Sequence, residues 1–239
     1  MKKTLILAAI AALALNANAA TVNKKDSVNP NKPRFTVIKE NPITSIKNQN
    51  RSGTCWDYST LSFFEAEILK ATGKAYDLSE AFVANKTYMD RAIQVVRLHG
   101  DCQFSQGGSA YDPLYCIQHY GICPETAMAK TGSQYGDSLF NFNEFFNVMT
   151  PYVQAVAKSD AKKLSPAWKN GLQGILDSYL GATPKQFTYE GRTFTPKSFA
   201  AYIGLDSAAC NNYVSFNRAA ATVPPKPSVS VSPRRSSRT

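Results

Sequence analysis

A cysteine and a glutamine six residues apart carry the chemistry that this sequence suggests first. Cys55 stands at the head of a run whose apolar residues recur at helical spacing, and Gly73 follows where the C-terminal cap of a helix belongs. The spacing predicts a helix from Cys55 to about Thr72. A thiol in the first helical turn faces unpaired backbone N–H groups and the positive end of the helix dipole, and both favour the nucleophilic thiolate.

Gln49 supplies the second half of this chemistry. Its side-chain amide and the backbone N–H of Cys55 are two donors suited to the oxygen that becomes negative in a tetrahedral acyl-transfer intermediate. Gly53 allows the backbone to turn sharply just before the helix. The alternative for Cys55 is a buried structural thiol, the ordinary state of a free cysteine. The spacing from Gln49 to Cys55, with Trp56 directly after the cysteine, favours a nucleophile.

Two segments resemble parts of papain-like cysteine peptidases. Ser52-Gly53-Thr54-Cys55-Trp56 resembles their active-site segment, with Ser52 where many members have a cysteine, so the disulfide made there cannot form. Ser105-Gln106-Gly107-Gly108-Ser109 resembles the Gly-Gly wall of their substrate groove. Three further segments are similar to the bleomycin hydrolase and aminopeptidase C branch: Ile46-Lys47-Asn48-Gln49, Leu78-Ser79-Glu80 and His119-Tyr120-Gly121-Ile122.

The resemblance, which runs from roughly Phe35 to Tyr213, implies an α+β fold of the papain type. It implies mainly the helical half with the active-site helix, while the β-rich half is largely missing. The implied activity is that of a cysteine-type, aminopeptidase-like peptidase that cleaves peptide substrates through an acyl-thioester. The implied roles are nucleophile for Cys55, oxyanion donor for Gln49, and substrate binding for Trp56, Gly107 and Gly108. No cofactor is implied.

A cysteine peptidase also needs a base, and the sequence offers no obvious one. In papain-like enzymes the histidine lies about 130–150 residues beyond the cysteine. The two histidines of this chain, His99 and His119, lie 44 and 64 residues beyond Cys55. We therefore expect little or no activity from this chain alone. The alternative is a non-catalytic pseudo-peptidase that binds peptides, or a non-functional fragment. Asp57, an acid where relatives have a small residue, is expected to be exposed in the first turn and to oppose thiolate formation.

The ends of the chain differ in composition from its body. Residues 1–19 have a positive start, an apolar run and Ala17-Asn18-Ala19, which predicts a cleaved secretory signal and a periplasmic or secreted protein without a membrane anchor. Residues 20–34 read as a flexible lead-in, and 35–218 as the incomplete peptidase region. Residues 219–239 form a basic tail rich in Pro, Ser and Arg, which predicts disorder.

Charge and cysteine content argue against two other classes of protein. The net charge of +10 falls to +4 when the two lysines of the leader and the four cations of the last eighteen residues are removed. No basic stripe is interleaved with aromatics, so the sequence does not predict nucleic-acid binding. The spacing of Cys116 and Cys123 is not a zinc pattern, so no metal site is predicted. Cys102, Cys116, Cys123 and Cys210 are available for disulfides whose pairing, like the oligomeric state, the sequence leaves open.

Periodicity and caps predict the remaining elements. The predicted helices run from a cap at Asp77 or Ser79 to about His99, and over Asp112–Tyr120, Leu139–Ala157 with a break near Pro151, Ser165–Leu180 and Thr195–Tyr202. Phe35–Lys39 is expected to form a short strand, and the segments on either side of Glu190-Gly191 a hairpin.

Overall fold

The computed structural model describes residues 36–128, 133–134 and 139–211. The chain divides into two units, Met1–Glu40 and Asn41–Thr239. The predicted leader, the lead-in and the basic tail lie outside the described residues. The described part of the second unit is mainly helical, and its strands are the two short ones of one hairpin.

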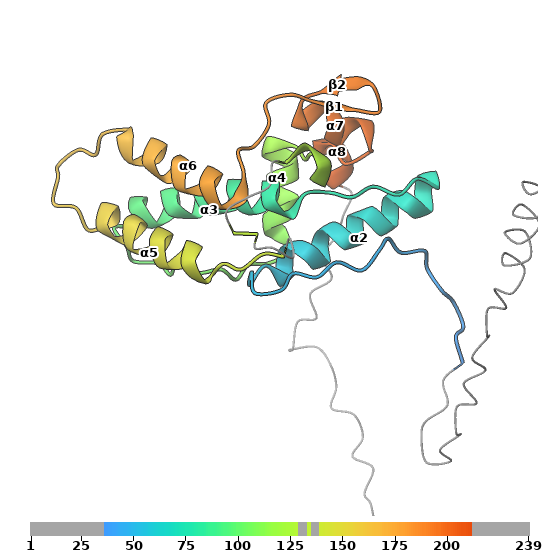
Figure 1. The fold of residues 1–239 in the computed structure, drawn as a ribbon, viewed down its shortest axis with the longest axis horizontal. Helices are drawn as coiled ribbons and strands as arrows, with labels where there is room; N and C mark the ends of the chain where they lie inside the picture. The colour runs from blue at the N-terminus through green and yellow to red at the C-terminus, as the bar shows by residue number, and fades with distance from the viewer. Residues whose placement is uncertain (1–35, 129–132, 135–138, 212–239) are drawn as a thin grey trace, which may run out of the picture. The chain divides into compact units, whose positions relative to one another are not determined.

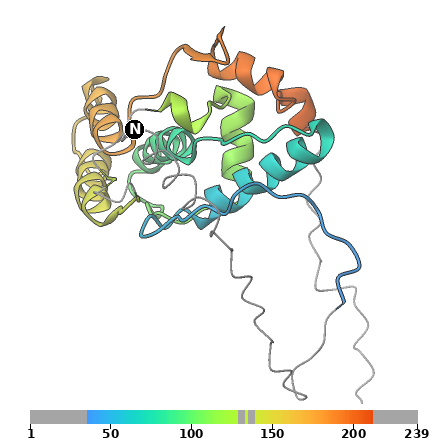
Figure 2. The ribbon, with the colours of Figure 1, turned by 45° about the vertical axis from the view of Figure 1, so that its right-hand side comes forward.

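Helix α3 (Glu80–Arg97) is the element around which the other helices pack. It contacts α2 (Cys55–Thr72), α4 (Tyr111–Tyr120), α5 (Asn143–Ala157) and α6 (Ala167–Leu180). Figures 1 and 2 show α5 and α6 side by side against α3, with α2 and α4 on its other flank. A short 3₁₀ turn, η1 (Glu125–Ala127), follows α4. This arrangement lets α3 touch the first turn of α2 and the loop that precedes α4.

Aromatic side chains from several elements meet in the core. Tyr88 of α3 is fully buried and packs edge-on against Trp56 of α2 and against Phe142, Phe145 and Phe146. Edge-to-face contacts of this kind contribute about 0.5–1.5 kcal/mol each beyond the area that they bury. Tyr88 thus ties the start of α2 to α3 and α5.

A second group of elements packs on α4. Strands β1 (Phe187–Tyr189) and β2 (Arg192–Phe194) pair antiparallel, with Phe187 opposite Phe194. Helices α7 (Pro196–Tyr202) and α8 (Ser207–Cys210) follow and contact α4. Gly121, which ends α4, lies so close to the backbone of Pro196 that a Cβ would collide with it.

Most of the predicted elements are confirmed. Helix α2 begins at Cys55 and ends at Thr72, with Gly73 in the left-handed conformation at φ 73°. Ser79 caps α3 by accepting a hydrogen bond from the N–H of Phe82. Glu190 and Gly191 both have positive φ, as a two-residue hairpin requires. The capping box of α7 at Thr195 is also present.

Four predictions of secondary structure need correction. The described part of the expected strand, residues 36–39, forms none. Helix α5 begins at Asn143 rather than Leu139, and it continues through Pro151 without a break. Helix α6 is preceded by Pro166 as its cap, and no side chain caps it, so Ser165 does not have that role. The four-residue helix α8 was not predicted because it is too short to show a period.

Candidate active site

Cys55 is the first residue of α2 and is exposed. The cap residue Thr54 makes no side-chain hydrogen bond to the helix, because its hydroxyl lies 2.5 Å from the hydroxyl of Ser52 in a buried pair. The first N–H groups of a helix have no partner within it, and among the described residues no side chain bonds the N–H groups of Cys55 and Trp56. The start of α2 is therefore open to a negative charge such as a thiolate or an oxyanion.

The loop that leads into α2 is fixed by a distant segment. Asn50, in the left-handed conformation at φ 49°, donates its side-chain amide to the carbonyl of Phe140 at 3.1 Å. The backbone N–H of Arg51 bonds the same carbonyl, and the N–H of Phe142 bonds the carbonyl of Arg51. Sequence reasoning missed this anchor, since no local signal links residues ninety positions apart. The loop holds Cys55 in place without any contribution from its own side chain.

Gln49 lies in the segment without regular secondary structure before this loop, and it is half-buried. Among the described residues its side-chain amide makes no hydrogen bond that would hold it away from the start of α2. Gly53, between Gln49 and the helix, has φ 60° and lies against the side chain of Gln106, which a Cβ at this position would strike. The glycine-bearing loop of residues 105–109 therefore comes directly beside the turn that precedes Cys55.

Trp56 links α2 to that loop. Its ring is buried, and its Nε1–H donates to the carbonyl of Gln106 at 2.9 Å. A Cβ at Gly108 would lie within 3 Å of the Trp56 ring, so only glycine fits there. Gly107 and Gly108 are themselves exposed. The structure thus brings together Cys55, Trp56 and the two glycines that the sequence singled out.

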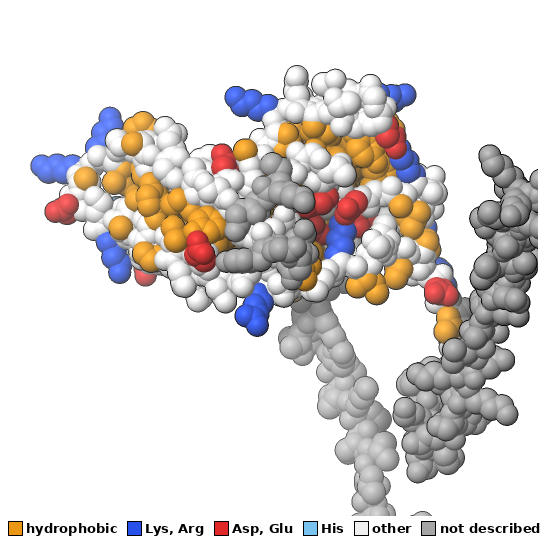
Figure 3. Space-filling view, in the orientation of Figure 1, with side chains coloured by type: hydrophobic (Ala, Val, Ile, Leu, Met, Phe, Trp, Pro, Cys, Tyr) orange, Lys and Arg blue, Asp and Glu red, His pale blue; other side chains and the backbone are white. Residues whose placement is uncertain are grey.

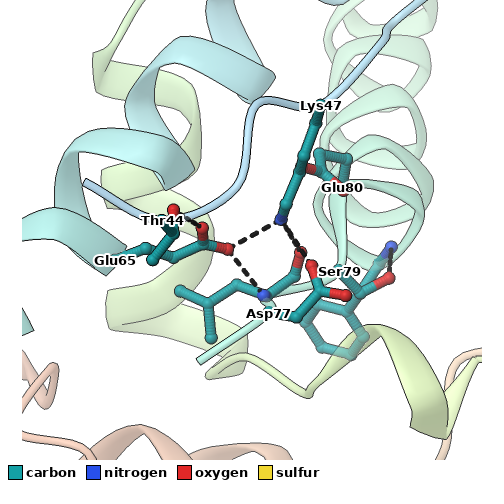
Figure 4. A network of polar contacts seen from close by, with 8 residues as sticks. Thr44, Lys47, Glu65, Asp77, Ser79 and Glu80 are labelled. Atoms are coloured by element: carbon teal, nitrogen blue, oxygen red, sulfur yellow. Dashed lines mark hydrogen bonds and ion pairs between the residues drawn. The ribbon is translucent and has the colours of Figure 1, made fainter. Parts of the chain in front are cut away.

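A buried charged cluster holds the segment that carries Gln49 against α2 and α3 (Figure 4). The Lys47 ammonium lies 2.7 Å from Glu65 Oε1, 2.7 Å from Asp77 Oδ1 and 3.1 Å from Glu80 Oε1. Glu65 also accepts hydrogen bonds from the hydroxyl of Thr44 and from the N–H of Leu78. Figure 3 shows acidic side chains gathered beside basic ones in the middle of the face that it draws.

Burial sets the charge states of this cluster. Burial raises the pKa of Glu80 to about 7, although the charge of Lys47 opposes the shift. Burial by itself lowers the pKa of Lys47, but Glu80, Asp77 and Glu65 together outweigh this and raise it. Lys47 is therefore a permanent cation, while Glu80 changes charge close to neutral pH.

Asp57 is buried, and the expectation of an exposed first-turn acid is wrong. Its side chain is fully enclosed, and neither carboxylate oxygen bonds to another described residue. Burial, reinforced by the charge of Glu80, raises the pKa of Asp57 well above its ordinary value. A largely neutral carboxyl does not oppose a thiolate at Cys55 in the way that an exposed charge would.

The other four cysteines differ from Cys55 in exposure. All five are free, but Cys102 is half-buried and the remaining three are buried. Burial raises the pKa of Cys210 to about 11, and it raises the pKa values of Cys116 and Cys123 as well. Thiols in this state are poor nucleophiles at neutral pH. Among the described residues, Cys55 is the one exposed cysteine.

Among the described residues, neither imidazole forms a hydrogen bond with Cys55. His119 stacks on Tyr115 with ring centroids 3.8 Å apart, and its Nδ1 bonds the carbonyl of Tyr115. His99 lies beyond the end of α3 beside Gly100, which faces Gln154 and Ala157 of α5.

In the described part of the chain, no three histidine, cysteine or acidic side chains are placed to hold a metal ion. No helix of that part is long and apolar enough to span a bilayer.

Comparison with known proteins identifies the family of this chain. Residues 32–168 match the family described as papain family cysteine protease. Cysteine proteinase 2 of Entamoeba histolytica is 27% identical over 186 residues, covering 75% of this chain and 50% of the relative. Aminopeptidase C of Listeria monocytogenes is 25% identical over 229 residues, covering 82% and 50%. Among solved structures, PepW of Lactobacillus rhamnosis aligns with a TM-score of 0.49 at 20% identity, covering 84% of this chain and 52% of that chain.

The chain spans about half the length of these curated relatives. The family match covers more than half of the chain and confirms the predicted papain-like fold, seen here as its helical part with the active-site helix. The Aminopeptidase C relative supports the predicted bleomycin hydrolase and aminopeptidase C branch. By its sequence match, this chain belongs to the papain family of cysteine proteases.

Proposed function

We propose that this chain carries the nucleophile and the substrate-binding wall of an aminopeptidase-like cysteine peptidase. The observation that carries the proposal is the exposed Cys55 at the uncapped start of α2, beside a Gly-Gly loop held by the neighbouring Trp56. The Cys55 thiolate attacks the peptide carbonyl carbon, and the negative oxygen meets the Cys55 N–H and the Gln49 amide. The C–N bond then breaks, which leaves a thioester that water hydrolyses.

The leaving amine needs a proton, and the chain offers no imidazole to give it. His119 is hydrogen-bonded to Tyr115 of its own helix, and His99 follows the end of α3, so we propose neither as the partner of the thiolate. Loss of a general acid–base costs about 10²–10⁴ in rate. We therefore propose that the chain alone is inactive or nearly so. The same observation favours the second candidate, a pseudo-peptidase that binds peptides without cleaving them.

Hydrolysis of aminoacyl- and peptidyl-aminomethylcoumarin tests the catalytic part of this proposal. We expect the full chain to release coumarin no faster than Cys55→Ala. Added imidazole should restore release in the full chain but not in Cys55→Ala, because it supplies the missing proton donor. Turnover without imidazole that disappears in Cys55→Ala would show that the chain has a base of its own.

We also propose that the protein is periplasmic or secreted and that its substrates are peptides. The leader of residues 1–19 supports the first point, and the exposed Gly107-Gly108 backbone supports the second.

A further inference from the structure

The loop that carries Gly107 and Gly108 has three successive carbonyls turned toward the protein. Arg91 Nη1 donates to the carbonyl of Ser105 at 3.3 Å and to that of Gly107 at 2.5 Å. The carbonyl between them, of Gln106, accepts from Trp56 Nε1 at 2.9 Å and from the Tyr88 hydroxyl at 3.2 Å. The guanidinium of Arg91 therefore binds the first and third of these carbonyls, and two aromatic side chains bind the second.

Arg91 is itself fixed on several sides. It projects from α3, with its guanidinium carbon 5.0 Å from the Trp56 ring centroid and 5.7 Å from that of Tyr88. Its Nη2 lies 3.1 Å from Asp112 Oδ2, and the same oxygen accepts from the N–H of Ser109 at 2.7 Å. The Arg91–Asp112 pair therefore connects the residues on both sides of Gly108.

The residue left between these anchors is Gly108. Arg91 and Trp56 occupy the space in which a side chain at this position would lie, since a Cβ would collide with both. Gly108 is exposed, and within the described residues its backbone N–H and C=O form no hydrogen bond. An extended peptide binds such a backbone by adding main-chain hydrogen bonds, and its affinity depends on how rigidly that backbone is held.

We infer that Arg91 is a positioning residue for peptide binding: it holds the Gly107-Gly108 backbone in the conformation that receives a substrate main chain beside Cys55. The inference rests on the proposed function and adds the residue that sets the affinity of that site. A planar guanidinium presents its donors in a rigid fork, so it holds two carbonyls and a carboxylate in one fixed geometry, whereas an ammonium on a flexible stem fixes them less rigidly. Arg91 also lines two cavities of about 460 and 250 Å³, and Gln94 is the one other described residue that lines both.

A peptidyl chloromethyl ketone tests the inference on the full chain, because it must occupy the groove before it alkylates Cys55. Iodoacetamide serves as the comparison, since it reacts with the thiol without using the groove. We expect Arg91→Ala to raise the concentration of peptidyl reagent needed for half-saturation by about tenfold, the loss of one to two hydrogen bonds. The rate with iodoacetamide should not change. Arg91→Lys should restore only part of the affinity.

Lys70→Ala is the control, because Lys70 is an exposed cation near the C-terminal end of α2 and lines neither cavity. If Arg91→Ala does not fold, Asp112→Asn provides the same test, since it weakens the pair that orients the guanidinium. If the concentration of peptidyl reagent at half-saturation is unchanged in both Arg91→Ala and Asp112→Asn, the inference is overturned. Non-saturable labelling of the unmodified chain would instead contradict the proposed function itself, so the two failures are distinguishable.

Discussion

Lys47→Met is expected to lower the free energy of unfolding by about 3–5 kcal/mol, the usual cost of removing one partner from a buried ion pair. Lys47 is the cation of the cluster, and Glu65 and Glu80 are both buried beside it. Methionine retains most of the side-chain volume, so the loss of stability comes from removing the charge and not from lost packing. Urea denaturation followed by circular dichroism measures it.

The pH dependence of this loss has a defined sign. The ordinary pKa of Glu80 is 4.5, and its folded pKa is about 7, so the native state retains a proton that the unfolded chain releases between these values. Stability therefore falls as pH rises from 4.5 to 7. Without Lys47 the pKa of Glu80 in the folded protein rises further, so the stability continues to fall at higher pH. The penalty of Lys47→Met should be larger at pH 8 than at pH 5.

Two further variants separate the cluster from surface charge effects. Lys70→Met removes an exposed lysine 3.9 Å from Glu67 and should change stability by less than about 0.5 kcal/mol. Adding Glu65→Gln and Glu80→Gln to Lys47→Met should recover most of the loss, because no uncompensated charge then remains buried. A Lys47→Met loss no larger than that of Lys70→Met would contradict the buried cluster.

Asp57→Asn is expected to stabilise the protein by about 1–3 kcal/mol at pH 8, an unusual direction for a buried substitution. The raised pKa of Asp57 means that the native state holds its proton while the unfolded chain releases it above pH 3.8. Stability falls with rising pH by up to about 1.4 kcal/mol per unit across that window. Asparagine keeps the size of the side chain and removes the titration.

Thermal unfolding of Asp57→Asn and the unmodified chain between pH 4 and pH 8 measures this effect. The two melting temperatures should differ least at pH 4, close to the pH at which the unfolded chain begins to release the Asp57 proton, and should diverge as pH rises. Glu67→Gln is the control on the same helix, since Glu67 is partly exposed. Parallel pH profiles for Asp57→Asn and the unmodified chain would mean that Asp57 is ionised without cost.

Local signals predicted the elements that local interactions build. The bounds of α2 follow from apolar spacing and the C-terminal Gly73, and the hairpin follows from Glu190-Gly191. Thr195 followed by Pro196 likewise marked the start of α7. Pro151 misled the prediction because its effect on a helix depends on how the helix packs, and α5 buries Phe145, Met149 and Val153.

Long-range contacts account for what the sequence could not predict. Asp57 has the helical position of an exposed acid, and only the packing of α2 against its neighbours encloses it. Arg91 showed no motif, because its role depends on the meeting of α3 with the loop of residues 105–109. The Phe140 anchor of the loop before Cys55 depends in the same way on residues far apart in the chain.

The central claim, that Cys55 is a nucleophile in a peptide-binding groove, is tested most directly by identifying which thiol a peptidyl chloromethyl ketone modifies. Peptide mapping by mass spectrometry after reaction with less than one equivalent of reagent reads this out among the five free cysteines. The account predicts that the label lies on Cys55 and that an unreactive peptide of the same sequence slows its addition. Labelling mainly at Cys102, or labelling of Cys55 that the competing peptide does not slow, would contradict it.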